Sequence, residues 1–208
     1  MPNKNSRGRP VDSVKQQQQK DKLLSAAESL LEFKSYRNIT VREIADQSGI
    51  NPAMISYYFG NKEGLFIELI EHISKTHFVN MKNIQQQNEP IKHFIRFMLK
   101  TLSQNNSLAR LVQDEFREQD SRLSVEFINR FPKRMAQVLP NLIKTNTPIK
   151  DDTKAKYAAF TLVSMIVTPF IGHSVRKQGW GISDHELTTS DWSDHIYSMF
   201  MSGCSVNS

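Results

Sequence analysis

The sequence predicts an all-α protein, and three observations lead to that prediction. Apolar residues recur at helical spacing in almost every segment after Lys20. Gly, Pro and Asn separate these segments, at the places where helices end and begin. We find neither the alternation typical of a strand nor an internal repeat. With 208 residues and 38% hydrophobic content, the chain can bury the core of one large domain or two small ones.

The first two helices are predicted from their apolar residues and their caps. Leu and Ala recur from about Lys20 to Leu31, which indicates a first helix of about three turns. Thr40 and Glu43 are spaced as a capping box, so a second helix is expected over about residues 41–48. Gly49 ends it, because glycine adopts positive φ without strain.

The next two helices follow at once. Asn51 is placed to cap a third helix, Pro52 fits its first turn, and Gly60 ends it. Asn61 is placed to cap a fourth, whose apolar stripe consists of Leu65, Phe66, Leu69, Ile70 and Ile73.

Beyond residue 76 the helices are longer and their ends are less sharply marked. Helices are expected to open at Pro90 and Ser107. Pro132 and Pro140 should kink or split a helix over residues 123–143, and Pro169 should bend one over residues 151–177. A last helix follows from Ser190 or Asp191, after a loop over residues 178–189.

Residues 40–62 have the spacing of a helix-turn-helix. Ala45 is small where the second helix would cross the first, and Gly49 follows four positions later in the turn. Ile44, Ile50, Ile55 and Tyr58 are spaced to lock the two helices together. The spacing favours a DNA-binding helix-turn-helix over an ordinary αα-hairpin, the alternative that it leaves open.

The window ITVREIADQSGINPAMISYYFGNKEGLF, residues 39–66, resembles the signature of the TetR/AcrR family of bacterial transcriptional regulators. The resemblance covers about residues 20–70. It implies a homodimer that reads a pseudo-palindromic operator and is released from it by a small effector. One position departs from the family, because Ser56 stands where many members have a tyrosine that contacts the DNA backbone.

This resemblance assigns roles in DNA binding. The third helix is expected to enter the major groove, with Asn51, Pro52, Ala53 and Met54 facing base edges. Because the last three can make only apolar contacts, Arg42 is the best candidate for a bidentate guanine contact. The alternative for Arg42 is a solvated pair with Asp46 four residues later. The residues expected to hold phosphates are Thr40, Ser56, Tyr57, Tyr58 and Lys62.

The N-terminus is expected to be a flexible basic arm over residues 1–19. Residues 1–22 hold six basic and two acidic residues, a large part of the chain's net charge of +6. Arg7 and Arg9 flank Gly8, a pattern that resembles an AT-hook core and suits an A·T-rich minor groove. A tail that only aids solubility is the alternative.

The remaining chain divides into a DNA-binding domain over 20–67 and a ligand-binding and dimerisation domain over 68–205. The last two long helices hold more apolar surface than one small domain needs, so we expect them to pair with a second copy in a four-helix bundle. An internal core is the alternative. The predicted interface residues are Phe160, Val163, Val167, Phe170, Ile171, Trp192, Ile196 and Phe200.

A pocket for an apolar or aromatic effector has candidate lining residues. They are Phe94, Phe97, Met98, Phe116, Phe127, Phe131, Met165 and His173. Phe and Met at helical spacing serve a hydrophobic core equally well, so core packing is the alternative for each.

Other classes of protein find little support. The histidines lack metal-ligand spacing, and there is neither a nucleophile elbow nor a Gly-rich phosphate loop, so we expect no catalysis, metal or cofactor. The single cysteine, Cys204, suits the cytoplasm, and no segment suits a membrane span. The alternative within DNA-binding proteins is an activator or architectural factor that recruits another protein without a small-molecule switch.

Overall fold

A computed structural model describes residues 13–104, 107, 110–111 and 121–206, and all regular structure in this part of the chain is helical. The all-α prediction is confirmed. The main helices are α1 (Ser13–Leu31), α2 (Val41–Ser48), α3 (Ala53–Phe59), α4 (Lys62–Ile84), α5 (Pro90–Gln104), α7 (Arg122–Arg130), α8 (Pro132–Asn146), α9 (Asp152–Ile171) and α10 (Ser190–Val206).

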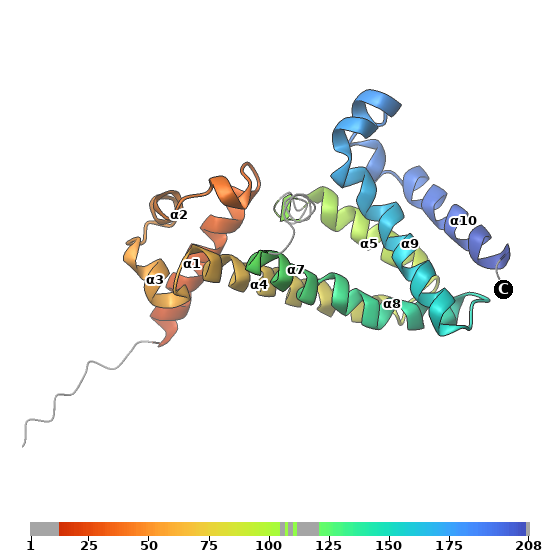
Figure 1. The fold of residues 1–208 in the computed structure, drawn as a ribbon, viewed down its shortest axis with the longest axis horizontal. Coiled ribbons are helices and arrows are strands. Elements are labelled where there is room, and N and C mark those ends of the chain that lie inside the picture. Colours follow the sequence, from red (N-terminus) through yellow and green to blue (C-terminus); the bar gives the residue numbers. More distant parts are fainter. Residues whose placement is uncertain (1–12, 105–106, 108–109, 112–120, 207–208) are drawn as a thin grey trace, which may run out of the picture.

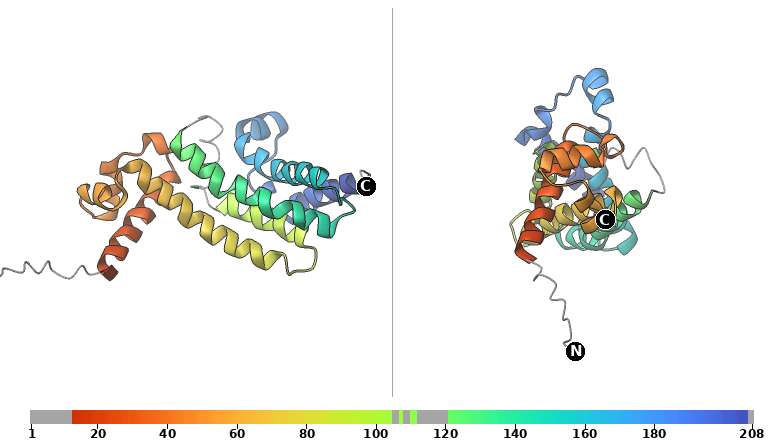
Figure 2. Two further views of the ribbon diagram at one scale, coloured as in Figure 1. Left: turned by 60° about the horizontal axis from the view of Figure 1, so that its bottom comes forward. Right: turned by 90° about the vertical axis from the view of Figure 1, so that its left-hand side faces the viewer.

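The helices form two groups that share α4 (Figure 1). α1, α2 and α3 surround the first turns of α4 at one end of the molecule, and α5 and α7–α10 form the other end. Figure 2 shows the resulting elongated shape. α4 packs against α1 and α3 in the first group and against α5 and α7 in the second. A helix of 23 residues is about 34 Å long, so α4 connects the two groups directly.

The first group has a small core of its own. Leu23 and Ala27 of α1, Ile44 of α2, Ile55 of α3 and Phe66 of α4 are all fully buried. Each side chain lies on the apolar face of its own helix, and together they fix the positions of four helices. The core therefore accounts for the rigid placement of α2 and α3.

α1 begins earlier than the sequence predicts. It starts at Ser13, so residues 13–19 are helical although the sequence predicts them to be part of a flexible arm. The Nε2 of Gln17 donates to Oδ1 of Asp21 over 2.8 Å, one turn later. Gln19 and Lys20 contact the end of α3, as described below, and these contacts favour the additional turns of helix.

The prolines act in different ways. Pro132 is the first residue of α8 and separates it from α7, which confirms a split at this point. Pro140 lies inside α8 without ending it, and Ala136, whose carbonyl loses its donor, is exposed. The helix predicted to reach residue 177 ends at Ile171, and a π-helical turn follows over Val175–Gly179.

Candidate functional site

α2, α3 and the turn between them form the helix-turn-helix that the sequence predicts. The capping box is present: Thr40 Oγ1 accepts from the Glu43 N–H over 3.2 Å, and Glu43 accepts from the Thr40 N–H over 2.9 Å. Gly49 ends α2 with a φ of 67°, in the left-handed region. Ile44, Ala45 and Ile55 are buried between the helices.

Glu43 has a second partner. Lys34, in the loop after α1, forms an ion pair with the Glu43 carboxylate. This contact, together with the hydrogen bonds that the Thr40 N–H and hydroxyl donate to the carboxylate, lowers the pKa of Glu43 to about 2. The start of α2 is thus fixed to the preceding loop by charge as well as by its cap.

Arg42 lies on the outer face of α2. Its side chain is 89% exposed, and its Nε lies 3.9 Å from an Asp46 carboxylate oxygen. A pair so long and so exposed holds the guanidinium weakly. Arg42 is therefore able to leave Asp46 for a base edge, and its predicted guanine contact stays a prediction.

The first turn of α3 is exposed as a recognition surface requires. Asn51, Pro52 and Ala53 are all exposed, and Asn51 Oδ1 accepts from the Ala53 N–H over 2.9 Å. Met54 is half-buried and packs against the core, so it has less surface for a base than its neighbours. The accessible apolar groups at this end of α3 are those of Pro52 and Ala53.

The predicted phosphate ligands on α3 do not share one environment. Ser56 and Tyr57 are exposed, and Tyr57 has 67% of its surface open to solvent. Tyr58 is half-buried, and its hydroxyl donates to Oε1 of Gln19 in α1 over 2.5 Å. Lys20 Nζ lies 5.9 Å from the Tyr58 ring and 5.8 Å from the Phe59 ring. Tyr58 thus joins α3 to α1.

Lys62, at the start of α4, is directed into the protein. Its ammonium donates to the carbonyl oxygens of Ile39 over 2.9 Å, Tyr36 over 3.0 Å and Arg37 over 3.4 Å. It also lies 4.3 Å from the Tyr36 ring centroid, and burial lowers the pKa of Lys62. These contacts explain a cation at a helix N-terminus without a phosphate, so the phosphate contact stays a prediction.

The junction between α3 and α4 depends on Gly64. Asn61 caps α4, because its Oδ1 accepts from the Gly64 N–H over 2.8 Å. A Cβ on Gly64 would lie 2.0 Å from the carbonyl oxygen of Phe59, which is a backbone atom. Only a residue without a side chain fits here, and this close approach sets the angle between α3 and α4.

The residues predicted for the N-terminal arm, Arg7 and Arg9, lie outside the described part of the chain. Their minor-groove contact stays a prediction.

The first helix group is connected to the second by polar contacts as well as by α4. Arg110 Nε donates to the Glu32 carbonyl oxygen over 3.1 Å, and Ser107 Oγ lies 3.5 Å from a Glu28 carboxylate oxygen. Ser107 and Arg110, between α5 and α7, are thus joined to α1 and to the turn that follows it.

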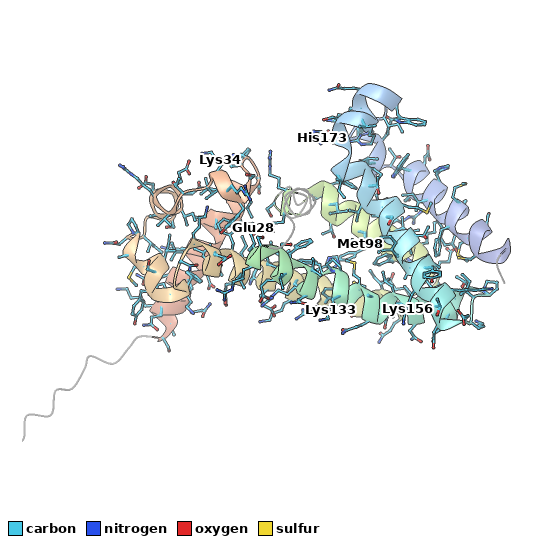
Figure 3. The ribbon with its side chains drawn as sticks, viewed as in Figure 1. Glu28, Lys34, Met98, Lys133, Lys156 and His173 are labelled. Atoms are coloured by element: carbon cyan, nitrogen blue, oxygen red, sulfur yellow. The ribbon has the colours of Figure 1, made fainter. Side chains whose placement is uncertain are left out.

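The residues predicted to line an effector pocket are only partly gathered together. Phe94, Met98, Phe127 and Phe131 are buried, and Phe97 and Met165 are half-buried. His173 is exposed beyond the end of α9 and lies far from Met98 in Figure 3, so the structure does not bring it together with the other predicted pocket residues. Phe116 lies outside the described residues.

One buried polar residue in this core was not predicted. His77 of α4 is 3% exposed, and Phe97 and Phe131 contact its ring, with centroids 4.9 Å and 5.9 Å away. Phe78 and Phe127 complete what we call the His77 cluster: His77, Phe78, Phe97, Phe127 and Phe131. Burial lowers the pKa of His77 to about 4.

A sequence signal for His77 exists. The apolar stripe of α4 continues past Ile73 to Met81 and Ile84, and His77 stands in that stripe four residues after Ile73 and four before Met81. A histidine in an apolar stripe is a candidate for burial, whereas a search for metal-ligand spacing passes over it.

A network of charged groups holds α4 against α7 and α8 beside this cluster. Arg130 Nε donates to a Glu71 carboxylate oxygen over 2.7 Å, and Arg130 also pairs with Glu126. Arg134 donates to Ser74 Oγ over 3.0 Å, and Ser74 Oγ donates to the Arg130 carbonyl oxygen. The network fixes the α7–α8 junction, and with it Phe131, to the middle of α4.

The predicted dimer residues divide into three sets by exposure. Ile196 and Phe200 are buried inside the core of one chain, so they are not available to a partner. Phe160 is 75% exposed. The remaining five are half-buried: Val163, Val167, Phe170, Ile171 and Trp192. Tyr157 and Met199, which were not predicted, are also exposed on α9 and α10.

Among the described residues, none of the helices combines the length and the apolar character that a membrane span needs. Nor does that part of the chain hold a group of three His, Cys, Asp or Glu side chains placed to ligate a metal.

Comparisons with known proteins agree with this geometry. Residues 23–69 match the family described as bacterial regulatory proteins, tetR family. The chain is 33% identical over 114 residues to the HTH-type transcriptional dual regulator CecR of Shigella flexneri, which covers 51% of this chain and 50% of CecR. It is 24% identical over 198 residues to the uncharacterized HTH-type transcriptional regulator YvkB of Bacillus subtilis, which covers 89% and 97%.

The fold is also that of a solved regulator. The structure of FadR from Bacillus subtilis, in complex with stearoyl-CoA, has a TM-score of 0.72 and 21% sequence identity. The match covers 88% of this chain and 98% of FadR, and at this identity it shows the fold alone.

The fold and the α2–turn–α3 unit define a helix-turn-helix DNA-binding protein. Within that class, residues 23–69 are similar to the DNA-binding domain of the tetR family of bacterial regulatory proteins, and the chain spans about half the length of CecR.

Proposed function

We propose that this regulator is a homodimeric repressor that binds a pseudo-palindromic operator and leaves it when a small, largely apolar effector binds. The observation that carries the proposal is the exposed edge formed by Arg42 on α2 and residues 51–53 on α3, above a fully buried core. A rigid helix pair with an exposed first turn on its second helix suits insertion into the major groove.

Roles within this surface follow from exposure. Arg42 carries hydrogen-bonded base readout, and Pro52 and Ala53 contact thymine methyl groups. Thr40, Ser56 and Tyr57 lie exposed where phosphates flank the groove. We assign Tyr58 a supporting role, because its hydroxyl is held by Gln19.

The dimer uses the outer face of α9 together with α10. Phe160 and Tyr157 of α9 and Met199 of α10 are 75%, 69% and 58% exposed. Solvent contact with apolar side chains of this size is unfavourable, and a symmetric pairing of the two helices with a second copy removes it. Two copies related by a twofold axis present two recognition helices, which accounts for a pseudo-palindrome.

The proposed release by an effector is supported by the aromatic core of the second helix group. α4 runs from this core to the recognition helix, so a ligand that displaces α4 also displaces α3. The alternative, an activator or architectural factor without a small-molecule switch, uses the same DNA surface.

Selection on random duplex DNA tests the proposal. Enrichment of an inverted repeat is the expected result, and its affinity should fall steeply with salt. Arg42→Ala should relax discrimination at one position of each half-site by roughly 1–3 kcal/mol. Lys133→Ala, an exposed cation of α8 outside the helix-turn-helix (Figure 3), removes the same charge and should leave discrimination unchanged.

Each other result has a clear meaning. Binding without sequence preference contradicts the proposed operator and favours an architectural role. A protein that is monomeric at micromolar concentration contradicts the homodimer. In that case the mass measured in solution is the same for wild type and for Phe160→Asp.

A further inference from the structure

The first part of the connection between α9 and α10, residues 172–185, is built around a buried arginine, and we call it the α9–α10 loop. Arg176 is only 6% exposed. Its guanidinium donates to the carbonyl oxygen of Pro169 over 3.0 Å, and to the carbonyl oxygen of Ile182 and the Asp184 carboxylate over 2.5 Å each. The Ile182 N–H donates back to the Arg176 carbonyl oxygen over 3.2 Å. A buried guanidinium with several charge-assisted hydrogen bonds holds the loop in one conformation.

This fixed loop presents two apolar side chains to solvent. Trp180 is 77% exposed and Val175 is 66% exposed. Gly181, with a φ of 68°, turns the chain directly after Trp180. Val175 begins a π-helical turn, a rare geometry that occurs mostly at functional sites. Because Arg176 ties the two sides of the loop together, Trp180 cannot fold back onto its own chain without breaking those hydrogen bonds.

The loop continues the proposed dimer face of α9. Tyr157, Phe160, Val167 and Ile171 are spaced by three, seven and four positions, so they share one side of the helix. The first two are exposed and the other two are half-buried. Val175 follows four positions after Ile171, where the chain leaves α9 for the loop. In Figure 1 the start of the loop, the upper blue segment, projects past the end of α9. The apolar stripe and the exposed loop therefore form one continuous surface.

We infer that the α9–α10 loop is a dimerisation arm that packs against the second copy, with Trp180 as its anchor and Arg176 as a positioning residue. The inference rests on the proposed function, because it extends the homodimer beyond α9 and α10. A second copy is the occupant that the continuity favours, since a twofold pairing of the two α9 stripes brings the partner to the loop. Tryptophan is enriched among the side chains that carry binding energy, and a preorganised loop loses little conformational entropy on association.

The dissociation constant of the dimer tests the inference. Analytical ultracentrifugation of the full chain without DNA compares wild type with Trp180→Ala over a dilution series. The substitution should raise the dissociation constant by about tenfold or more, as expected for an aromatic anchor. Phe33→Ala is the matched control, because Phe33 is 75% exposed in the turn after α1, and it should dimerise as wild type does. Circular dichroism verifies that both variants fold, which their exposure leads us to expect.

A second measurement keeps the anchor in place. The chain has two tryptophans, so Trp192→Phe leaves Trp180 as the single source of tryptophan fluorescence. The dissociation constant of this variant is measured first. Quenching by acrylamide should then fall as the protein concentration rises through that constant, because the partner covers the Trp180 ring.

The positioning role of Arg176 has a test of its own. Arg176→Met should weaken the dimer in the wild-type chain but add little in a chain that already carries Trp180→Ala, because both substitutions remove the same contact. Independent, additive effects would show that Arg176 acts on the dimer by another route than Trp180.

The remaining outcomes separate this inference from the proposed function. A dimer that Phe160→Asp dissociates but Trp180→Ala leaves intact, with Trp180 quenched alike at all concentrations, overturns the arm and keeps the homodimer. Trp180 then faces a different protein, as the alternative of a recruiting activator requires. A wild-type chain that is monomeric throughout refutes the homodimer and the arm together. A dimer that depends on Trp180 but selects no operator supports the arm and refutes the DNA-binding part alone.

Discussion

The phenolic oxygen of Tyr58 lies 2.5 Å from Oε1 of Gln19, 39 positions earlier in the chain. This hydrogen bond joins the last turn of the recognition helix to the early turns of α1. The bond stabilises the turns of α1 that precede the predicted start of the helix. It also gives the Tyr58 hydroxyl a partner inside the protein, whereas the sequence predicts that this hydroxyl contacts a phosphate.

Tyr58→Phe separates the two roles. The ring stays and the hydroxyl is lost, so the free energy of unfolding should fall by about 1 kcal/mol. The affinity for the selected operator at one fixed salt concentration should stay that of wild type. Tyr57→Phe is the control for stability, with no expected loss. A lower DNA affinity of Tyr58→Phe with unchanged stability would instead support a phosphate contact of the Tyr58 hydroxyl.

Lys62→Met tests the three carbonyl contacts at the start of α4. A methionine keeps the length of the stem and removes the donors, so the carbonyls of Tyr36 and Ile39 lose a charged partner. The free energy of unfolding in urea should fall by roughly 1–3 kcal/mol. Lys133→Met, at an exposed position of α8, should change stability little. Unchanged stability with a reduced salt slope would instead show that Lys62 acts on phosphate.

Gly64→Ala should be strongly destabilising. The added Cβ would meet the Phe59 carbonyl oxygen at 2.0 Å, and the backbone would have to move. We expect a loss of about 3 kcal/mol, well above the gain in helix propensity that alanine brings. Gly203→Ala in α10, where a Cβ meets nothing within 4 Å, is the matched control and should be neutral or stabilising. Equal effects at both positions would contradict the close approach.

Acid should destabilise the fold through His77. Its pKa is about 4 in the folded chain and about 6.5 when unfolded, so between these values the unfolded state binds one more proton. Stability therefore falls as the pH decreases from 6.5 to 4, by roughly 3 kcal/mol in total. Urea unfolding of wild type and His77→Phe across this range should show the smaller dependence in the variant. Parallel curves would mean that His77 is accessible to protons in the folded state.

The parts of the fold that the sequence predicts well depend on neighbours in the chain. The capping box of Thr40 and Glu43, the glycine at 49 and the cap at Asn61 act within four residues, and all are present. The helix-turn-helix was therefore recognisable from one window. The class of the protein followed from the same residues.

The parts that it predicts poorly depend on distant contacts. The carbonyls that bind Lys62 lie 23 to 26 positions away, and two of the rings around His77 come from α5 and from the α7–α8 junction. An apolar pattern shows that Phe200 is hydrophobic, but it does not distinguish the core of one chain from a surface shared by two. Only the folded structure shows that Ile196 and Phe200 are buried whereas Phe160 is exposed.

The exposed first turn of α3 has a consequence for chemically modified DNA. Pro52 and Ala53 offer a base only carbon and hydrogen, and the group in the major groove that they can recognise is the methyl on C5 of thymine. If α3 lies in that groove, replacing such a thymine by deoxyuridine should weaken binding although every hydrogen bond of the base pair is kept. Conversely, 5-methylcytosine carries the same methyl at the same position of its ring, so methylation of a cytosine that faces Pro52 or Ala53 should change the affinity for the site without altering its sequence.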